Sequence, residues 1–233
     1  MGKYKPVYMF TDDANKLAAE LKKDGEALKN LLGGKGANLN IMMSAGLPVP
    51  PGFTVTTEQC IAFMKAGEKM PAGLDKEIDK CVAELEKQAG KKFGDPQNPL
   101  LVSVRSGARD SMPGMMDTVL NIGMNDEVAE AMVKMTGNER FVFDAYRRLI
   151  MMFGDVVMGV KRHAFEECFD QVKKEEGVKE DTQVSAAGLR KVVELEKAVY
   201  KKAIGKSFPQ DAREQLWAGV RAVFESWNND RAV

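Results

Sequence analysis

The pattern of apolar residues changes at about Asn125, and this change restricts the fold more than any other feature of the 233-residue chain. Before it, short β-branched runs such as Phe53–Val55 and Leu100–Val104 alternate with segments of helical spacing. After it, the apolar residues recur at helical spacing. We therefore expect an α+β lobe over residues 1–124, followed by a mainly helical bundle subdomain over residues 125–233.

Local signals place the elements of the first part. Lys5–Phe10 predicts a short strand at a sheet edge, because Pro6 cannot donate a backbone hydrogen bond. Gly33–Gly36 predicts a glycine loop, and Ala37–Ala45 predicts the helix that follows it. The apolar run Leu100–Val104 predicts a central strand.

Five helices are expected in the second part. Asn125 should cap the first and Ser185 the fourth, because these side chains accept hydrogen bonds from free amides of a first helical turn. The second helix should carry a wide apolar face from Phe141 to Val157. On the fourth helix, the charged stretch Lys191–Lys202 is typical of a solvated face.

Composition excludes several classes of function. Lys plus Arg and Asp plus Glu each number 34, so no basic excess favours binding to nucleic acid. No apolar run approaches the roughly 20 residues that cross a bilayer, so no association with a membrane is expected. The three cysteines are far apart and predict neither a disulfide framework nor a zinc site. We expect a cytoplasmic protein.

The charged side chains of the second part predict no metal site. His163 is the single histidine of the chain, which excludes a histidine-rich metal site, and it fits an ordinary helix position. Asp126, Glu127 and Glu130 fit a first helical turn, where carboxylates interact favourably with the helix dipole. Arg147 and Arg148 lie on an otherwise apolar helix, where either a solvated stripe or local ion pairs would explain them.

The glycines around Lys35 suggest a phosphate-binding turn but match no standard nucleotide motif. A Walker loop needs Ser or Thr after the lysine, and Gly36 stands there. A dinucleotide fingerprint needs a third glycine at the position of Leu39. What remains is an ammonium group near a helix N-terminus, where an anion is favoured. A phosphate site and a surface turn both stay open for Lys35.

Arg105 and the glycines behind it form the second candidate anion site. A rigid apolar strand ends in Arg105, and Gly107 and Gly114 let backbone amides approach a ligand closely. A guanidinium at the end of a buried strand needs a carboxylate or a ligand beside it. The alternatives are therefore an ion pair with Asp110 or Asp117 and a bound phosphate.

The methionines of the same loop also leave two interpretations open. Methionine fills irregular space in a core, and beside glycines it can line an adaptable slot for a flat purine ring. The residues concerned are Met112, Met115 and Met116.

Three stretches of the chain resemble one known family closely. LLGGKGANLNIMMSAGLPVPPGFTVT, residues 31–56, is similar to the opening shared by the dikinases that phosphorylate pyruvate. VRSGARDSMPGMMDTVLNIGMND, residues 104–126, resembles the pyruvate phosphate dikinase branch, whereas the phosphoenolpyruvate synthase branch begins Val-Arg-Ser-Ser-Ala. RFVFDAYRRLIMMFGDVVM, residues 140–158, is similar to the phosphate dikinase branch as well.

The resemblance implies the first lobe of an ATP-grasp domain. In that fold two α+β lobes hold ATP between them, and the γ-phosphate passes to a histidine on a swivelling domain. The phosphohistidine then carries the group to a barrel domain, where pyruvate becomes phosphoenolpyruvate, with AMP and diphosphate as the other products. The implied cofactors are ATP and Mg²⁺.

The functional residues of the family fall on the two glycine-rich segments. Its glycine-loop lysine corresponds to Lys35 and its strand-end arginine to Arg105, and the resemblance makes these two residues catalytic. Arg109 and Arg148 fit as further phosphate contacts. The family's Met-Pro-Gly loop over the nucleotide implies contacts from Ser111, Met112, Gly114, Met115, Met116, Asp117 and Thr118.

The remaining parts of the family pattern are expected beyond Val233. They are a second ATP-grasp lobe with the carboxylates that hold Mg²⁺, a phosphohistidine domain and a pyruvate barrel; His163 lacks the Thr-Ser-His-Ala context of the phosphocarrier. We therefore expect an N-terminal fragment that is monomeric, inactive alone and dependent on the remainder of its polypeptide, which the family assembles as a homodimer. The alternatives are the ATP domain of a phosphoenolpyruvate synthase-type dikinase and a nucleotide-binding module without catalysis.

Overall fold

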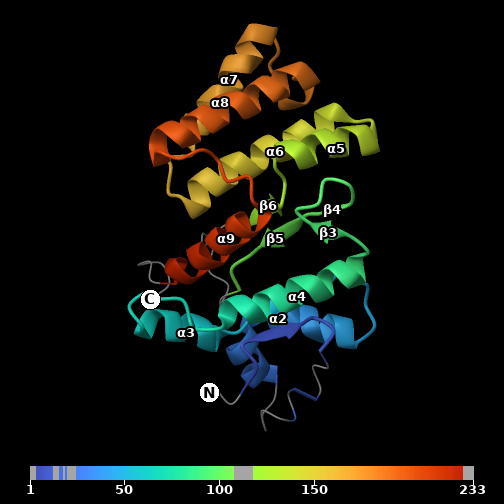
Figure 1. The fold of residues 1–233 in the computed structure, drawn as a ribbon, viewed down its shortest axis with the longest axis vertical. Coiled ribbons are helices and arrows are strands. Elements are labelled where there is room, and N and C mark those ends of the chain that lie inside the picture. Colours follow the sequence, from blue (N-terminus) through green and yellow to red (C-terminus); the bar gives the residue numbers. More distant parts are fainter. Residues whose placement is uncertain (1–3, 13–15, 18, 20–24, 108–117, 228–233) are drawn as a thin grey trace. The chain divides into compact units, whose positions relative to one another are not determined.

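The computed structural model describes residues 4–12, 16–17, 19, 25–107 and 118–227. The chain divides into two compact units, each built from separate segments (Figure 1). The first unit comprises residues 1–90, 106–115 and 223–233, and the second comprises residues 91–105 and 116–222. Both units mix helices with short strands or loops, in agreement with an α+β protein.

The described residues of the first unit include a two-stranded sheet and three helices of nine or more residues. Strand β1 (Val7–Met9) pairs antiparallel with β2 (Phe53–Val55), so that Tyr8 lies opposite Thr54. The strands expected over 5–10 and 53–55 are therefore confirmed, the first in shortened form. The helices are α2 (Gly25–Ser44), α3 (Thr57–Lys65) and α4 (Leu74–Ala89).

The core of the first unit lies between α2 and the sheet. Leu28, Leu31, Leu32 and Ala37 on α2 are buried together with Tyr8 of β1. They follow the spacing of one helix face, which explains why the amphipathic pattern of this segment packs on the sheet. Burial of these residues holds α2, which carries the candidate glycine segment, against the sheet of β1 and β2.

The strands of the second unit form two small sheets. β3 (Lys92–Phe93) pairs parallel with β4 (Pro99–Leu100), and β5 (Val102–Val104) pairs antiparallel with β6 (Val119–Ile122). The expectation of one central strand over 100–104 is wrong. The run is divided at Leu101, because its two halves pair with different partners and β5 carries a register irregularity between Val102 and Val104.

Helices make up the rest of the second unit, and the last of them ends in the first unit, beyond Ala222. α6 and α8 pack together, with α5 beside α6 and α7 beside α8 (Figure 1). A π-helical turn follows α6, and a short 3₁₀ turn precedes α8. The five helices expected after Asn125 are confirmed, including the Asn125 and Ser185 caps. The elements are α5 (Asp126–Thr136), α6 (Glu139–Met152), the π turn (Phe153–Val157), α7 (His163–Glu176), the 3₁₀ turn (Asp181–Gln183), α8 (Ala186–Ile204) and α9 (Ala212–Ser226).

An aromatic cluster lies in the core of the second unit. The ring of Phe208 packs edge-on against Phe153 and Tyr200, with centroids 5.5 Å apart in each pair, and against Tyr146 at 6.2 Å. Phe141, which was expected on the apolar face of the second helix, is instead 56% exposed. Its neighbour Val142 is fully buried, so Phe141 lies on the solvent-facing side of α6.

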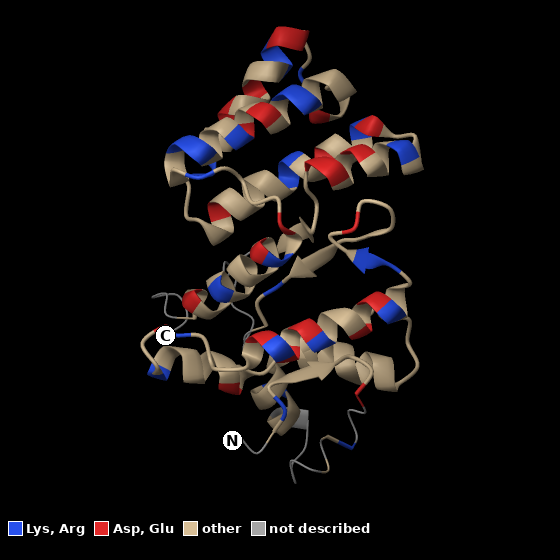
Figure 2. Ribbon diagram, in the orientation of Figure 1, with Lys and Arg blue, Asp and Glu red and all other residues tan. Residues whose placement is uncertain are grey.

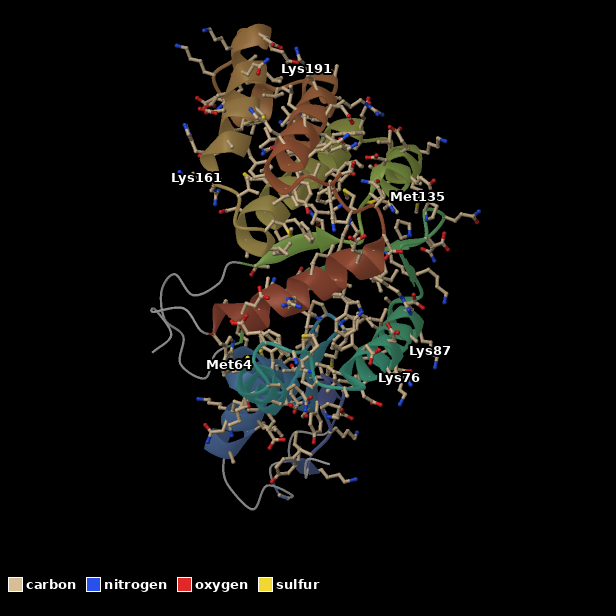
Figure 3. The ribbon with its side chains drawn as sticks, turned by 60° about the vertical axis from the view of Figure 1, so that its left-hand side comes forward. Met64, Lys76, Lys87, Met135, Lys161 and Lys191 are labelled. Atoms are coloured by element: carbon tan, nitrogen blue, oxygen red, sulfur yellow. The ribbon has the colours of Figure 1, made fainter. Side chains whose placement is uncertain are left out.

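Charges of both signs cover the outer helix surfaces. Lys or Arg and Asp or Glu alternate along α4, α7 and α8 (Figure 2). Lys76 and Lys87 project from α4, and Lys161 and Lys191 lie at the outer side of the second unit (Figure 3). Within the part of the chain that the structure describes, no helix has both the length and the apolar character needed to cross a membrane.

Candidate functional site

Helix α2 is interrupted at Gly33. Gly33 has φ 70° and ψ 167°, a combination that is open essentially only to glycine. The loop expected over Gly33–Gly36 is therefore wrong in extent, because Gly33 alone leaves the helical conformation. Residues 34–44 form a second helical segment, and Lys35 lies in its first turn.

The backbone of Gly107 lies directly against Gly33. A Cβ atom added to Gly33 would overlap the carbonyl group of Gly107. A Cβ atom added to Gly107 would lie 3.9 Å from the Cβ atom of Lys35. The structure therefore brings the turn that carries Lys35 together with residues 106–107, the start of the second candidate segment, inside the first unit.

Gly36 has a packing role that the sequence does not reveal. A Cβ atom at this position would lie 2.7 Å from Oγ1 and 2.8 Å from Cγ2 of Thr54, the middle residue of β2. Those distances are shorter than carbon side chains tolerate. Gly36 therefore allows the second half of α2 to approach the sheet, so a close approach to a ligand is not needed to explain this glycine.

Lys35 itself is exposed. Among the described residues, no hydrogen bond or ion pair joins its ammonium group to another side chain. The first amides of a helical segment lack partners within that segment and carry partial positive charge. An exposed cation beside such amides is an arrangement that can hold an anion.

Arg105 follows β5 and is also exposed. The strand end is not buried as expected, because Val102 and Val104 are only half-buried in a sheet of two strands, so burial alone does not require a partner for Arg105. No ion pair links Arg105 to any described residue. The two carboxylates weighed as its partners, Asp110 and Asp117, lie outside the described residues.

Most of the predicted nucleotide loop also lies outside the described residues. Thr118 is described; it is half-buried and immediately precedes β6. The predicted residues outside the described ranges are Arg109, Ser111, Met112, Gly114, Met115, Met116 and Asp117.

Arg148 and its neighbour Arg147 form local ion pairs on α6. Arg148 Nη2 lies 2.8 Å from Asp144 Oδ2, and Arg147 Nη2 lies 2.7 Å from Asp144 Oδ1. The side chain of Arg148 is 54% exposed, whereas that of Arg147 is 8% exposed. Local pairing is thus confirmed for both arginines, and the solvated stripe is wrong for Arg147, whose guanidinium stacks on Phe169 at 4.0 Å.

Glu196 is a buried carboxyl group that sequence reasoning missed. It is 1% exposed although it lies inside the stretch interpreted as a solvated face. A signal was present, because Leu189, Val192, Val193, Glu196 and Tyr200 recur at the spacing of one helix face. Burial raises the pKa of Glu196 well above its usual value; the charge of Arg147 opposes this shift, and that of Asp144 adds to it.

Glu196 and Arg147 line a cavity of about 300 Å³ formed by residues of α6, α7 and α8. The other basic groups in its wall already have partners: Arg162 binds Glu166, and Lys173 binds Asp170 and Asp181. Glu196 Oε2 and Arg147 Nε have no hydrogen-bond partner among the described residues, and both atoms are closed off from solvent. The cavity therefore does not expose its two unpaired polar atoms to a ligand.

Two other charged residues singled out earlier, His163 and Asp126, have structural partners. His163 is exposed and lies 3.1 Å from Glu167 Oε1, in agreement with an ordinary helix position. Asp126 pairs with Lys197 at 2.6 Å and accepts a hydrogen bond from the Tyr146 hydroxyl at 2.7 Å. In the described ranges, no group of three or more Asp, Glu, His or Cys side chains is arranged to hold a metal ion.

Comparison with known proteins bears directly on this geometry. Residues 29–70 and 66–233 match the family described as "Pyruvate phosphate dikinase, AMP/ATP-binding domain". The chain belongs to this family. The break at Gly33 and Arg105 both lie within the matched residues.

Relatives in the pyruvate phosphate dikinase family support the same assignment. The chain is 49% identical over 215 residues to pyruvate, phosphate dikinase of Clostridium symbiosum, which covers 92% of this chain and 25% of that protein. It is 51% identical over 207 residues to pyruvate, phosphate dikinase 1, chloroplastic, of Arabidopsis thaliana, and 48% identical over 205 residues to pyruvate, phosphate dikinase of Rhizobium meliloti. These two alignments cover 89% and 88% of the chain but only 21% and 23% of the relatives. The chain thus spans about a quarter or less of the length of these dikinases.

Proposed function

We propose that this chain is the ATP-binding part of a pyruvate phosphate dikinase. The complete protein would transfer phosphoryl groups from ATP, by way of a phosphohistidine, to pyruvate and phosphate, giving phosphoenolpyruvate, AMP and diphosphate. The observation that carries the proposal is the match of residues 29–70 and 66–233 to the AMP/ATP-binding family. In this proposal the chain supplies the first lobe of an ATP-grasp cleft and the helical subdomain after it.

Lys35 would bind the polyphosphate of ATP. Its ammonium is exposed, lies in the first turn after the break at Gly33, and has no partner among the described residues. Phosphoryl transfer depends mainly on positioning and on neutralising the charge of the phosphate oxygens. An ammonium held beside free helix amides fits that requirement.

Arg105 would supply the second positive charge. Its guanidinium is exposed, and it can form two parallel hydrogen bonds to phosphate oxygens. Arg109 and the loop from Ser111 to Thr118 would then close over the nucleotide and exclude water. Arg148 is the least suited of the proposed contacts, because Asp144 already binds its guanidinium.

Mg²⁺ does not fit the side chains that the structure describes. No cluster of carboxylates suited to a metal ion is found among those residues. We therefore assign no step to a metal bound by this chain. The remainder of the polypeptide, including a second lobe, a phosphohistidine domain and a barrel, would complete the enzyme, with the homodimer and the cytoplasmic location also remaining proposals.

Calorimetric titration of the chain with ATP tests the proposal directly. We expect saturable binding by the unsubstituted chain, and we expect Lys35→Ala and Arg105→Ala to weaken it at least about tenfold, which corresponds to about 1.4 kcal/mol. Lys29→Ala is the matched control, because Lys29 is an exposed lysine on the first half of the same helix. Equal losses in Lys29→Ala and Lys35→Ala would refute a specific role for Lys35.

The complete polypeptide gives the catalytic test. Arg105→Ala should slow ATP-dependent phosphorylation of the carrier histidine at least about tenfold, because a charge that stabilises the transition state is lost. A rapid-quench measurement of histidine phosphorylation follows this step alone. An unchanged rate would remove Arg105 from the mechanism.

A further inference from the structure

The break in α2 leaves backbone carbonyl groups that need donors. In an unbroken helix, each carbonyl accepts from the amide four residues later, and the last turn of a segment lacks those amides. Gly33 ends such a segment, so the preceding turn must be satisfied from elsewhere in the first unit.

Thr57, the first residue of α3, provides that donor. Its Oγ1 lies 2.5 Å from the carbonyl oxygen of Asn30 and 3.2 Å from that of Leu31. One hydroxyl proton can be shared by two such acceptors, an arrangement common at helix ends. The hydroxyl thus closes the turn immediately before Gly33, although it is far from this turn in sequence.

The hydroxyl of Thr57 serves α2 and not its own helix, because the N-cap residue of α3 is Thr56. The cap residue of α3 is Thr56, which makes no side-chain capping hydrogen bond, and its Oγ1 has no partner among the described residues. Of these two adjacent threonines, Thr56 occupies the cap position of α3, and Thr57 donates its hydroxyl hydrogen bond to α2.

The second half of α2 is fixed by different contacts. Asn40 Nδ2 donates to the carbonyl oxygens of Phe10, at 3.1 Å, and Asp12, at 2.5 Å, beyond the end of β1. Gly36 packs on Thr54, and Gly33 packs on Gly107. The half after the break is thus held by the sheet and by Gly107, while Thr57 holds the half before it.

We propose that Thr57 is a positioning residue for the nucleotide site: its hydroxyl fixes the break at Gly33 and thereby the presentation of Lys35 and the amides of residues 34–36 to a phosphate. This inference rests on the proposed ATP-binding function. Thr57 does not touch the phosphate itself. It acts through the backbone of Asn30 and Leu31, whose carbonyl groups it ties to α3.

Three variants of the 233-residue chain test the inference. Thr57→Val removes the hydroxyl and keeps the shape, and Thr57→Ser restores the hydroxyl. Thr136→Val is the matched control, because Thr136 also donates to a backbone carbonyl at a helix end, that of Met132 at 2.7 Å, but in the second unit. Hydrogen–deuterium exchange over residues 33–37 and calorimetric titration with ATP are measured for each.

We expect Thr57→Val to speed exchange over residues 33–37 at least about fivefold and to raise the Kd for ATP at least about fivefold. Thr57→Ser should have an exchange rate and a Kd for ATP close to those of the unsubstituted chain. Thr136→Val should change neither the exchange rate over residues 33–37 nor the Kd. Unchanged exchange in Thr57→Val would overturn the inference, and so would faster exchange with an unchanged Kd. Failure of the unsubstituted chain to bind ATP would overturn the proposed function instead, while the exchange data still decide whether Thr57 holds the break.

Discussion

Replacing Glu196 by glutamine should raise the free energy of unfolding at neutral pH, and the gain should disappear in acid. Glu196 is 1% exposed, and its Oε2 atom lacks a hydrogen-bond partner among the described residues. Its closest charged neighbours on α6 are Arg147 and Asp144, which already bind one another. Glutamine keeps the shape of the side chain but cannot ionise.

The pH dependence follows from the direction of the pKa shift. Burial raises the pKa of Glu196 in the folded state well above the ordinary value of 4.5, so the folded protein holds this proton more tightly than the unfolded chain. The stability that the proton contributes is fully present below the unfolded pKa and is lost as the pH rises through the folded pKa. At neutral pH, the raised pKa of Glu196 therefore lowers the free energy of unfolding of the wild-type chain, and Glu196→Gln lacks this loss.

Each unit by which the folded pKa of Glu196 exceeds its unfolded pKa corresponds to about 1.4 kcal/mol, so a pKa held well above the usual value implies a gain of at least about this size. We expect Glu196→Gln to be more stable by about this amount at pH 7.5 and nearly equal to the wild type at pH 4, as measured by urea unfolding. Glu194→Gln is the control, because Glu194 lies on the same helix with 71% of its side chain exposed. A difference that does not vary with pH, or a less stable Glu196→Gln at pH 7.5, would refute the reasoning.

Two further substitutions test buried hydrogen bonds in the second unit. Gln215→Leu should lower the free energy of unfolding by about 2–4 kcal/mol, because the fully buried amide of Gln215 bonds three backbone groups, and leaving even one or two of them unpaired has a cost of this order; urea unfolding of Gln215→Leu with stability near wild type would contradict this. Asn125→Ala should cost about 1–2 kcal/mol, because the side chain caps α5 at Val128 N and also donates to the carbonyl of Gln210. Thermal unfolding checks the second substitution, and a loss below about 0.5 kcal/mol would argue against the cap.

Features set by neighbouring residues could be predicted from the sequence. Asn125 and Ser185 were expected as helix caps and are found as caps, because capping depends on residues only three positions apart. Phe53–Val55 was expected as a strand for similar local reasons. The position of Lys35 near the start of a helical segment also follows from a short motif.

Features that depend on distant partners could not be predicted. Glu196 was assigned to a solvated face because its charge outweighed its helical spacing, and its burial depends on α6 and α7. The division of the run 100–104 at Leu101 depends on β3 and β6, which pair with its two halves. Gly36 was given to a phosphate loop, whereas its close neighbour is Thr54 on a strand that follows later in the chain.

The contact between Gly33 and Gly107 has a consequence for the order of folding. Helical segments form within microseconds from local contacts, so the two halves of α2 can form early. The break between them reaches its final backbone geometry only when Gly107, far along the chain, packs against it. During synthesis, the turn that carries Lys35 therefore reaches its native geometry only after β5 and Gly107 have been synthesised.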